Sequence, residues 1–261
     1  MESTIFKMKD STISYFDAGK GSPLVLLHGF CGSSRYWENI IPELSKNYRV
    51  IAPDIPGHGE STILDKNYSI DDFANQIKTL LDELNIQEVT MFGHSLGGYI
   101  TLAFAEKYSQ RLNGFSLIHS TAFPDSDEAK KGRAANVEKV KQVGIQGLIN
   151  GLVPKLFSPD HLDEKYVALA KEIGYRTSPL GAIKTLIAMK ERPDRNFVLE
   201  GTQLPVLLLA GEKDQIIPSK NTFSVNKSNI KQSLIKNSGH MSMYENPLEL
   251  ISEIKEYLSI I

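Results

Sequence analysis

Cysteine is almost absent from this chain of 261 residues, which contains Cys31 and no other. A single thiol cannot build an internal disulfide framework, and it cannot supply a zinc site made of cysteines. An excess of one charge is lacking as well, because 29 Lys and Arg residues stand against 31 Asp and Glu residues, for a formal net charge of −2. We therefore expect neither a nucleic-acid surface nor a polybasic membrane anchor.

No apolar run approaches the ~18 residues that a membrane-spanning helix needs, and the first ten residues lack a basic stretch followed by an apolar core. Internal repeats and low-complexity tracts are also missing. What the chain does have is 41% hydrophobic residues, enough to bury a large core. These features predict a cytoplasmic protein without a membrane segment, folded as one domain with room for an insertion.

The most informative stretch is Gly93–Gly98, with the sequence GHSLGG. A short β-branched and aromatic run, Glu88–Phe92, precedes it, and Tyr99–Tyr108 follows with apolar residues at helical spacing. Ser95 therefore lies on a strand-to-helix turn in the pattern G-x-S-x-G, whose small residues allow a strained serine backbone. Such a turn, a nucleophile elbow, pushes the hydroxyl into a cleft and aims unpaired backbone N–H groups at it.

Strands and helices alternate through the first half of the chain. After a predicted opening hairpin of Ile5–Lys9 and Thr12–Phe16, the remaining patterns indicate further strands at 24–27, 48–52 and 114–119 and helices at 35–46 and 70–85. Near-continuous apolar strands that alternate with helices are typical of a parallel, doubly wound sheet. Ligands of such sheets lie at the carboxyl ends of the strands.

Between Ser120 and about Gly201 the alternation stops. Four helical patterns follow one another there without a strand, at 127–142, 147–157, 160–174 and 179–191. Roughly 80 residues of helix are too many for a simple crossover between parallel strands. We therefore expect residues 121–200 to form a helical lid, inserted into a core made of residues 1–120 and 201–261.

Two later strand patterns lie at 204–210 and 231–235, and a last helix begins at Pro247. Each of these strands is followed by a side chain that can assist Ser95. Asp214 stands four residues past the first strand and His240 five residues past the second. A serine hydroxyl at neutral pH needs a base to take its proton, and the base needs an anion to fix its tautomer. The chain order is therefore that of a serine, acid and histidine triad.

Asp125 is the rival for the acid, but it lies six residues past the end of its strand, so we favour Asp214. The other histidines are expected to pack within Gly-rich loops, to end a strand or to lie on the lid surface. They are His28, His58, His94, His119 and His161.

Five motifs in this order resemble the α/β-hydrolases, specifically the lidded bacterial type that includes carboxylesterases, cofactor-free haloperoxidase-like enzymes and carbon–carbon bond hydrolases. The motifs are HGF at 28–30, DxxGHGxS at 54–61, GHSLGG at 93–98, GxxD at 211–214 with Ile217-Pro218, and GH at 239–240 with Glu245-x-Pro247. The resemblance covers the whole chain. It implies the α/β-hydrolase fold, a mostly parallel doubly wound sheet with an inserted helical lid.

By this resemblance Ser95 is the nucleophile, His240 is the general base and then the acid, and Asp214 orients His240. The backbone N–H groups of Phe30 and Leu96 would form the oxyanion hole. Neither a metal nor a cofactor is expected. The residues expected to line the substrate pocket are His28, Gly29, Cys31, Phe123, Leu152, Phe157, Ile217 and Met241.

A serine at the elbow favours attack on a carbonyl, since related enzymes that open epoxides or displace halide use an aspartate there. The expected activity is hydrolysis of a small carboxylic ester through an acyl-enzyme. One alternative is a carbon–carbon bond hydrolase or a lyase-like member, although Tyr99 stands where the lyase-like group carries an arginine. The other alternative is a small-molecule receptor or stress-signalling regulator with an intact triad. The sequence predicts no particular oligomeric state.

Overall fold

The structure is a computed structural model that describes residues 3–8, 10–160 and 163–261. In these ranges an eight-stranded sheet has the order β1-β2-β4-β3-β5-β6-β7-β8. The β1–β2 and β2–β4 pairs are antiparallel and the others are parallel, which confirms the predicted mostly parallel sheet. The strands are β1 Thr4–Lys7, β2 Thr12–Ala18, β3 Pro23–Leu27, β4 Arg49–Pro53, β5 Val89–His94, β6 Leu112–Ile118, β7 Val206–Gly211 and β8 Ile230–Ile235.

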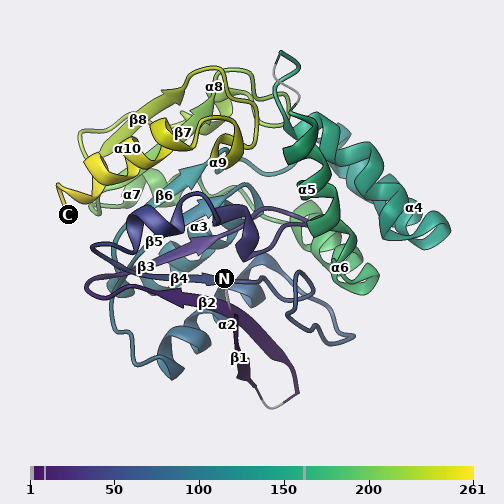
Figure 1. Ribbon diagram of the computed structural model, residues 1–261, viewed down its shortest axis with the longest axis horizontal. Helices are drawn as coiled ribbons and strands as arrows, with labels where there is room; N and C mark the ends of the chain where they lie inside the picture. Colours follow the sequence, from purple (N-terminus) through teal and green to yellow (C-terminus); the bar gives the residue numbers. More distant parts are fainter. Residues whose placement is uncertain (1–2, 9, 161–162) are drawn as a thin grey trace.

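Helices cover both faces of this sheet, which explains the composition of its central strands. Strands β5 and β7 are buried along their whole length, and apolar runs without alternation suit strands that are covered on both faces. One group of helices consists of α1 (Ile41–Leu44) packed against α10 (Pro247–Leu258). In the other group, α3 (Leu96–Tyr108) packs against α2 (Ile70–Glu83) and α7 (Asn196–Gly201), as Figure 1 shows.

The predicted helix over 35–46 is wrong. The chain instead forms a short 3-10 helix at Ser34–Trp37, followed by α1. Pro42 explains the interruption, because its nitrogen has no hydrogen to donate and its ring clashes with the carbonyl four residues earlier in a continuous helix. The same residue suits the first turn of α1, where backbone N–H groups have no partner within the helix.

Three long helices stand between β6 and β7, and Figure 1 shows them grouped at one end of the sheet. They are α4 (Asp127–Leu152), α5 (Glu164–Tyr175) and α6 (Pro179–Lys190). The helix predicted from residue 160 begins at Glu164, after the N-cap Asp163. The predicted surface position of His161 lies outside the described residues. Short elements that we did not predict separately are η3 (Val153–Leu156), α7, α8 (Ser219–Thr222) and α9 (Ser242–Glu245).

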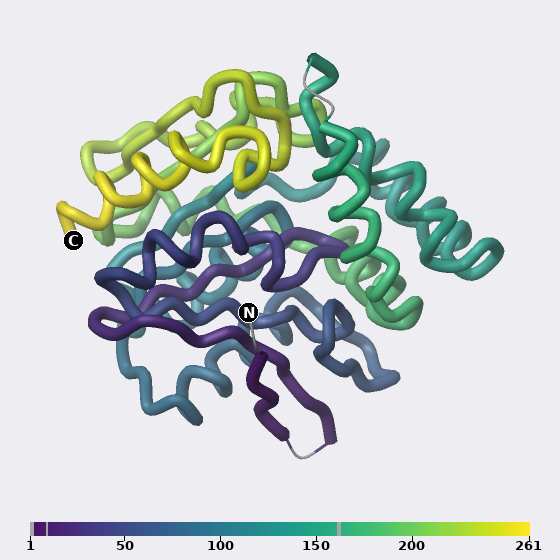
Figure 2. Tube along the Cα trace, in the orientation of Figure 1, coloured from purple at the N-terminus to yellow at the C-terminus, as the bar shows by residue number. Residues whose placement is uncertain are grey.

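The break that we predicted between residues 142 and 147 occurs at a single residue of α4. Gly144 has φ 71° and ψ −179°, outside the helical region. A Cβ added to Gly151 would lie 3.0 Å from Lys139 Nζ, although twelve residues of straight helix span about 18 Å. The two halves of α4 therefore turn back on each other, as the teal trace shows in Figure 2.

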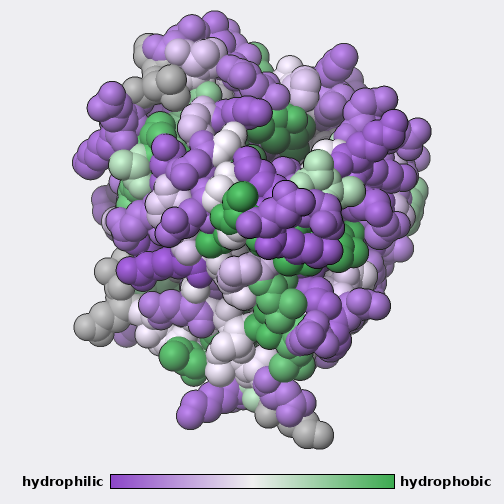
Figure 3. Space-filling view, turned by 90° about the vertical axis from the view of Figure 1, so that its right-hand side faces the viewer, coloured by the Kyte–Doolittle hydropathy of each residue, from purple (hydrophilic) through white to green (hydrophobic). Residues whose placement is uncertain are grey.

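Seen from the side of α4, α5 and α6, the surface carries hydrophobic patches between hydrophilic side chains (Figure 3). Exposed large hydrophobic side chains of the described residues include Phe123, Val143, Ile187 and Ile216. Within the described ranges, we find no helix that has both the length and the apolar character to cross a lipid bilayer.

Candidate active site

Ser95 occupies a strained turn between β5 and α3. Its φ of 51° and ψ of −111° are unfavourable for a residue with a side chain. The turn is held on both sides, because Ser95 N donates to Ile118 O at 2.9 Å and Ser120 Oγ donates to Ser95 O at 2.7 Å. The surrounding hydrogen bonds thus fix the serine in a conformation that its own backbone does not favour.

The two glycine positions that flank Ser95, at 93 and 97, have no room for a side chain. A Cβ added to Gly97 would lie 2.4 Å from the carbonyl oxygen of Leu27, and one added to Gly93 would lie 2.4 Å from that of Gly97. Both clashes involve backbone atoms, which cannot rotate away as the end of a side chain can. The G-x-S-x-G pattern is therefore the sequence signature of a helix packed directly onto the sheet.

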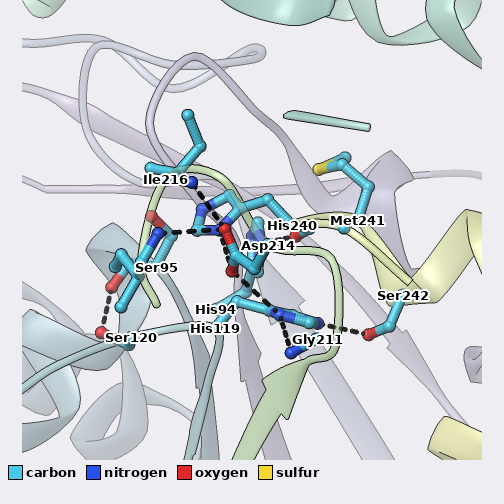
Figure 4. A network of polar contacts seen from close by, with 12 residues as sticks. His94, Ser95, His119, Ser120, Gly211, Asp214, Ile216, His240, Met241 and Ser242 are labelled. Carbon is cyan, nitrogen blue, oxygen red and sulfur yellow. Dashed lines mark hydrogen bonds and ion pairs between the residues drawn. The ribbon is translucent and has the colours of Figure 1, made fainter. Parts of the chain in front are cut away.

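Asp214 and His240 form a buried hydrogen-bonded pair in the loops after β7 and β8 (Figure 4). Asp214 Oδ2 lies 2.8 Å from His240 Nδ1, and Oδ1 accepts from the backbone N–H groups of Ile216 at 2.8 Å and Ile217 at 3.0 Å. Burial alone would raise the pKa of Asp214, but the charge and hydrogen bond of the neighbouring His240 outweigh it and hold that pKa well below its usual range. The ionised carboxylate therefore keeps the proton of His240 on Nδ1 and leaves Nε2 to exchange protons.

His119 is a neighbour of this pair that the sequence analysis treated only as a strand-end residue. Its Nδ1 lies 3.3 Å from Asp214 Oδ2 and 3.1 Å from the backbone nitrogen of Gly211, while Nε2 lies 2.7 Å from Ser242 Oγ. Burial lowers the pKa of His119, and the fixed Gly211 N–H needs an acceptor. We therefore assign the neutral ring with its proton on Nε2, donated to Ser242.

Among the described residues, one group has the spacing of a metal site. His119, Asp214 and His240 each offer a ligand atom, and these atoms lie within 4.8 Å of one another. The carboxylate already accepts three hydrogen bonds, and His119 Nδ1 accepts one from Gly211. The cluster is thus organised for hydrogen bonding and for orienting His240.

The loop that carries His240 is held by two further side chains. His94 Nε2 lies 2.8 Å from the carbonyl oxygen of His240. Glu245 Oε2 accepts from the backbone N–H groups of Gly239 at 2.9 Å and Met241 at 3.1 Å. Hydrogen bonds to a charged acceptor contribute about 1.5–3 kcal/mol each, so Glu245 is a strong clamp on the backbone next to His240.

Ser95 lines a cavity of about 520 Å³. Of the predicted pocket residues, Phe123 and Ile217 line this cavity as well. In the described part of the chain, Ser95 Oγ makes no hydrogen bond, and active-site hydrogen bonds are often long before substrate binds. The other lining residues are Tyr99, Thr121, Pro124, Asp125, Ser126, Ala129, Arg133, Arg192, Ile216 and Asn221.

The prediction that His28 contacts substrate needs correction. Its ring is fully buried, with Nε2 accepting from the backbone N–H of Ile55 at 2.8 Å and Nδ1 donating to Gly29 O at 2.8 Å. Both nitrogens are therefore used to hold backbone. The remaining predicted pocket residues are not among those that line the cavity. Gly29 lies against His94 and Ser95, since a Cβ added to it would be 3.4 Å from Ser95 Cβ. Cys31, Phe157 and Met241 are buried, and Leu152 is half-buried.

Two buried histidines make stability depend on pH. Burial lowers the pKa of His28 to about 4 and that of His58 to about 3. Between pH 6.5 and pH 4 the unfolded chain binds protons that the folded chain does not, so stability falls as pH falls. Urea unfolding should show a loss of about 2 kcal/mol per histidine between pH 7 and pH 5. His58→Gln should make this loss smaller, and an equal free energy of unfolding at both pH values would contradict the assignment.

Comparisons with known proteins agree with this geometry. Residues 22–148 match the family model described as the alpha/beta hydrolase fold. The solved structure of a thermophilic esterase from Thermogutta terrifontis with malate bound is 27% identical, with a TM-score of 0.93 over 99% of this chain and 98% of that chain.

Relatives of known name match as well. A 2-hydroxy-6-oxo-6-(2'-aminophenyl)hexa-2,4-dienoic acid hydrolase from Metapseudomonas resinovorans is 25% identical over 94% of this chain and 87% of its own length. An (E)-2-((N-methylformamido)methylene)succinate hydrolase from Acinetobacter baylyi is 38% identical over 53% of this chain and 52% of its own length. Since the sheet, the family model and these similarities agree, this chain belongs to the α/β-hydrolase fold family.

Proposed function

We propose that this member of the α/β-hydrolase family is a serine hydrolase that cleaves small carboxylic esters. Ser95 Oγ attacks the ester carbonyl while His240 Nε2 takes its proton, and the alcohol leaves with a proton returned by His240. Water, deprotonated by the same nitrogen, then releases the acid from the acyl-enzyme. Asp214 orients the imidazole throughout.

The observation that carries this proposal is the backbone of Ser95, whose φ of 51° is held by neighbouring hydrogen bonds in the wall of a cavity. Residues in such conformations cluster at functional sites, because surrounding structure must offset a cost of about 1–3 kcal/mol. The buried pair of Asp214 and His240, in loops at the same edge of the sheet, supplies the base that a serine nucleophile needs.

The backbone also supports an oxyanion hole at Phe30 and Leu96. Leu96 is the first residue of α3, where a backbone N–H has no partner within the helix. In the described part of the chain, neither N–H donates to a protein acceptor. Each such donor aimed at the developing oxyanion contributes about 2.7–4 kcal/mol to transition-state stabilisation.

We also propose that residues 121–200 act as the lid over this site. Helix α4 contributes Ala129 and Arg133 to the cavity that Ser95 lines. Helix α6 is tied to the core at its start, where Ser178 N donates to Gly57 O at 3.1 Å. This segment therefore forms the outer wall of the pocket and is expected to set substrate preference.

The proposal is tested with 4-nitrophenyl esters from acetate to decanoate, together with a serine-directed fluorophosphonate. We expect turnover that the fluorophosphonate abolishes, with the mass of the reagent found on the peptide that contains Ser95. Labelling of a different residue, or turnover that survives complete labelling of Ser95, would overturn the proposal.

A second candidate is hydrolysis of a carbon–carbon bond next to a carbonyl. The named relatives that match this chain act on a dienoic acid and on a methylenesuccinate, so the substrates of the family extend beyond simple esters. The same serine, base and oxyanion hole serve attack on a ketone. Fluorophosphonate labelling of Ser95 without turnover of any nitrophenyl ester would favour this candidate.

A further inference from the structure

The cavity at Ser95 carries an unbalanced charge. Its charged lining residues are Arg133 of α4, Arg192 after α6, and Asp125 before α4. Two guanidinium groups therefore face one carboxylate, and every other residue that lines the cavity is uncharged. A positively charged group in a partly enclosed site attracts anions more strongly than it would in bulk water.

Asp125 forms an ion pair with each of the two arginines. Its Oδ1 accepts from Arg192 Nη1 at 2.5 Å and its Oδ2 accepts from Arg133 Nε at 3.0 Å. With 5% of its side chain exposed, Asp125 is saturated by these two partners and is not the acid that orients His240. One carboxylate thus fixes two cations at the wall of the cavity.

Arg192 is the more buried of the two arginines, and several contacts hold its side chain in place. Its side chain is 4% exposed, its guanidinium lies 4.0 Å from the ring centre of Tyr99, and it donates to the carbonyl oxygens of Met189 and Phe123. Among the described residues, Arg192 Nε is buried and has no hydrogen-bond partner. A buried donor without a partner is costly, so the ion pair with Asp125 and the contact with Tyr99 hold Arg192 in place against that cost.

Arg133 is the more exposed of the two arginines. Its side chain is 25% exposed, and in the described ranges Nε makes its one hydrogen bond, to Asp125. The Nη1 and Nη2 donors therefore have no acceptor within that part of the chain. A planar guanidinium held in place at Nε is well suited to bind a carboxylate through its remaining N–H groups.

We propose that the acyl part of the substrate ends in a carboxylate, which Arg133 binds while Ser95 attacks the ester carbonyl. This inference rests on the proposed ester hydrolysis and adds its substrate class, the monoesters of dicarboxylic acids. Arg133 is then a specificity-determining residue. Asp125 positions it and neutralises Arg192, so that one net positive charge meets one carboxylate.

The test compares two esters of equal chain length, 4-nitrophenyl pentanoate and mono-4-nitrophenyl glutarate, which differ in a terminal methyl or carboxylate group. We expect wild type to have a kcat/KM for the glutarate ester at least about tenfold higher. Arg133→Gln should lower the ratio of the two kcat/KM values by about tenfold or more, and Arg133→Lys should restore part of it. Lys131→Gln, which removes the same charge from an exposed position of α4, should leave the ratio within twofold.

Binding of glutarate itself separates this inference from the proposed hydrolysis. Glutarate should raise the Tm of wild type and of Lys131→Gln, and raise that of Arg133→Gln much less. If glutarate shifts the Tm in this way while no ester is hydrolysed, the carboxylate site stands and the proposed reaction fails. If esters are hydrolysed with the same ratio in wild type and Arg133→Gln, and glutarate shifts neither Tm, the carboxylate site is refuted.

Discussion

Ser95→Ala is expected to lower kcat for ester hydrolysis by at least ~10³-fold while the protein still folds. The loss follows because no other hydroxyl takes the place of the nucleophile, and the oxyanion hole alone supports only a small remainder of the rate. Folding survives because alanine keeps the Cβ and therefore the same backbone strain at φ 51°. Initial rates with 4-nitrophenyl acetate at pH 7.5 measure the effect.

Ser95→Gly provides the matched variant. Glycine relieves the strained backbone, so its free energy of unfolding should exceed that of Ser95→Ala by about 1 kcal/mol or more. Both variants lack the hydroxyl and should be equally inactive. If Ser95→Ala retains a tenth of the wild-type rate, Ser95 is not the nucleophile. If the glycine variant gains no stability, the strain argument fails while the catalytic one remains.

Asp214→Asn should lower kcat by about 10⁴-fold, through the tautomer of His240. The backbone N–H groups of Ile216 and Ile217 both point at Oδ1, so the oxygen of the new amide must face them. Its NH2 group then faces His240 Nδ1 and donates to it. The imidazole is left with its proton on Nε2, where it cannot accept the proton of Ser95.

The readout for this variant is kinetic and spectroscopic. The ring-nitrogen NMR signals of His240 should report protonation at Nε2 instead of Nδ1, with folding retained. Asp65→Asn makes the same change at an exposed carboxylate and should leave kcat unchanged within twofold. A rate within tenfold of wild type for Asp214→Asn would show that another group orients the base, and His119 would be the next to test.

Counting from strand ends located Asp214 and His240, because the carboxyl ends of parallel strands share one edge of the sheet. The same reasoning missed the contact of Asp214 with His119. Strands β6 and β7 are neighbours in the sheet, yet the helices of residues 121–200 separate them in sequence. His119, the first residue after β6, therefore meets the loop after β7 through a pairing that local patterns do not encode.

The charged wall of the pocket was equally inaccessible to sequence reasoning. Arg133 lies among other charged residues of a helical segment and Arg192 directly follows another predicted helix, so neither position stands out in the sequence. Only the folded chain brings both side chains to Asp125, which the sequence offered merely as a rival acid. Helix periodicity shows which face of a helix is apolar, but it does not show which cations of different helices meet.

Gly144 gives the helical segment a mechanical property. A Cβ at this residue would have nothing within 4 Å, so its φ of 71° alone requires glycine. Two dihedral angles therefore set the angle between the half of α4 that carries Arg133 and the half whose Ile149 packs against Gly174 of α5. Any substitution that changes these two angles would therefore also move Arg133 relative to the cavity that Ser95 lines.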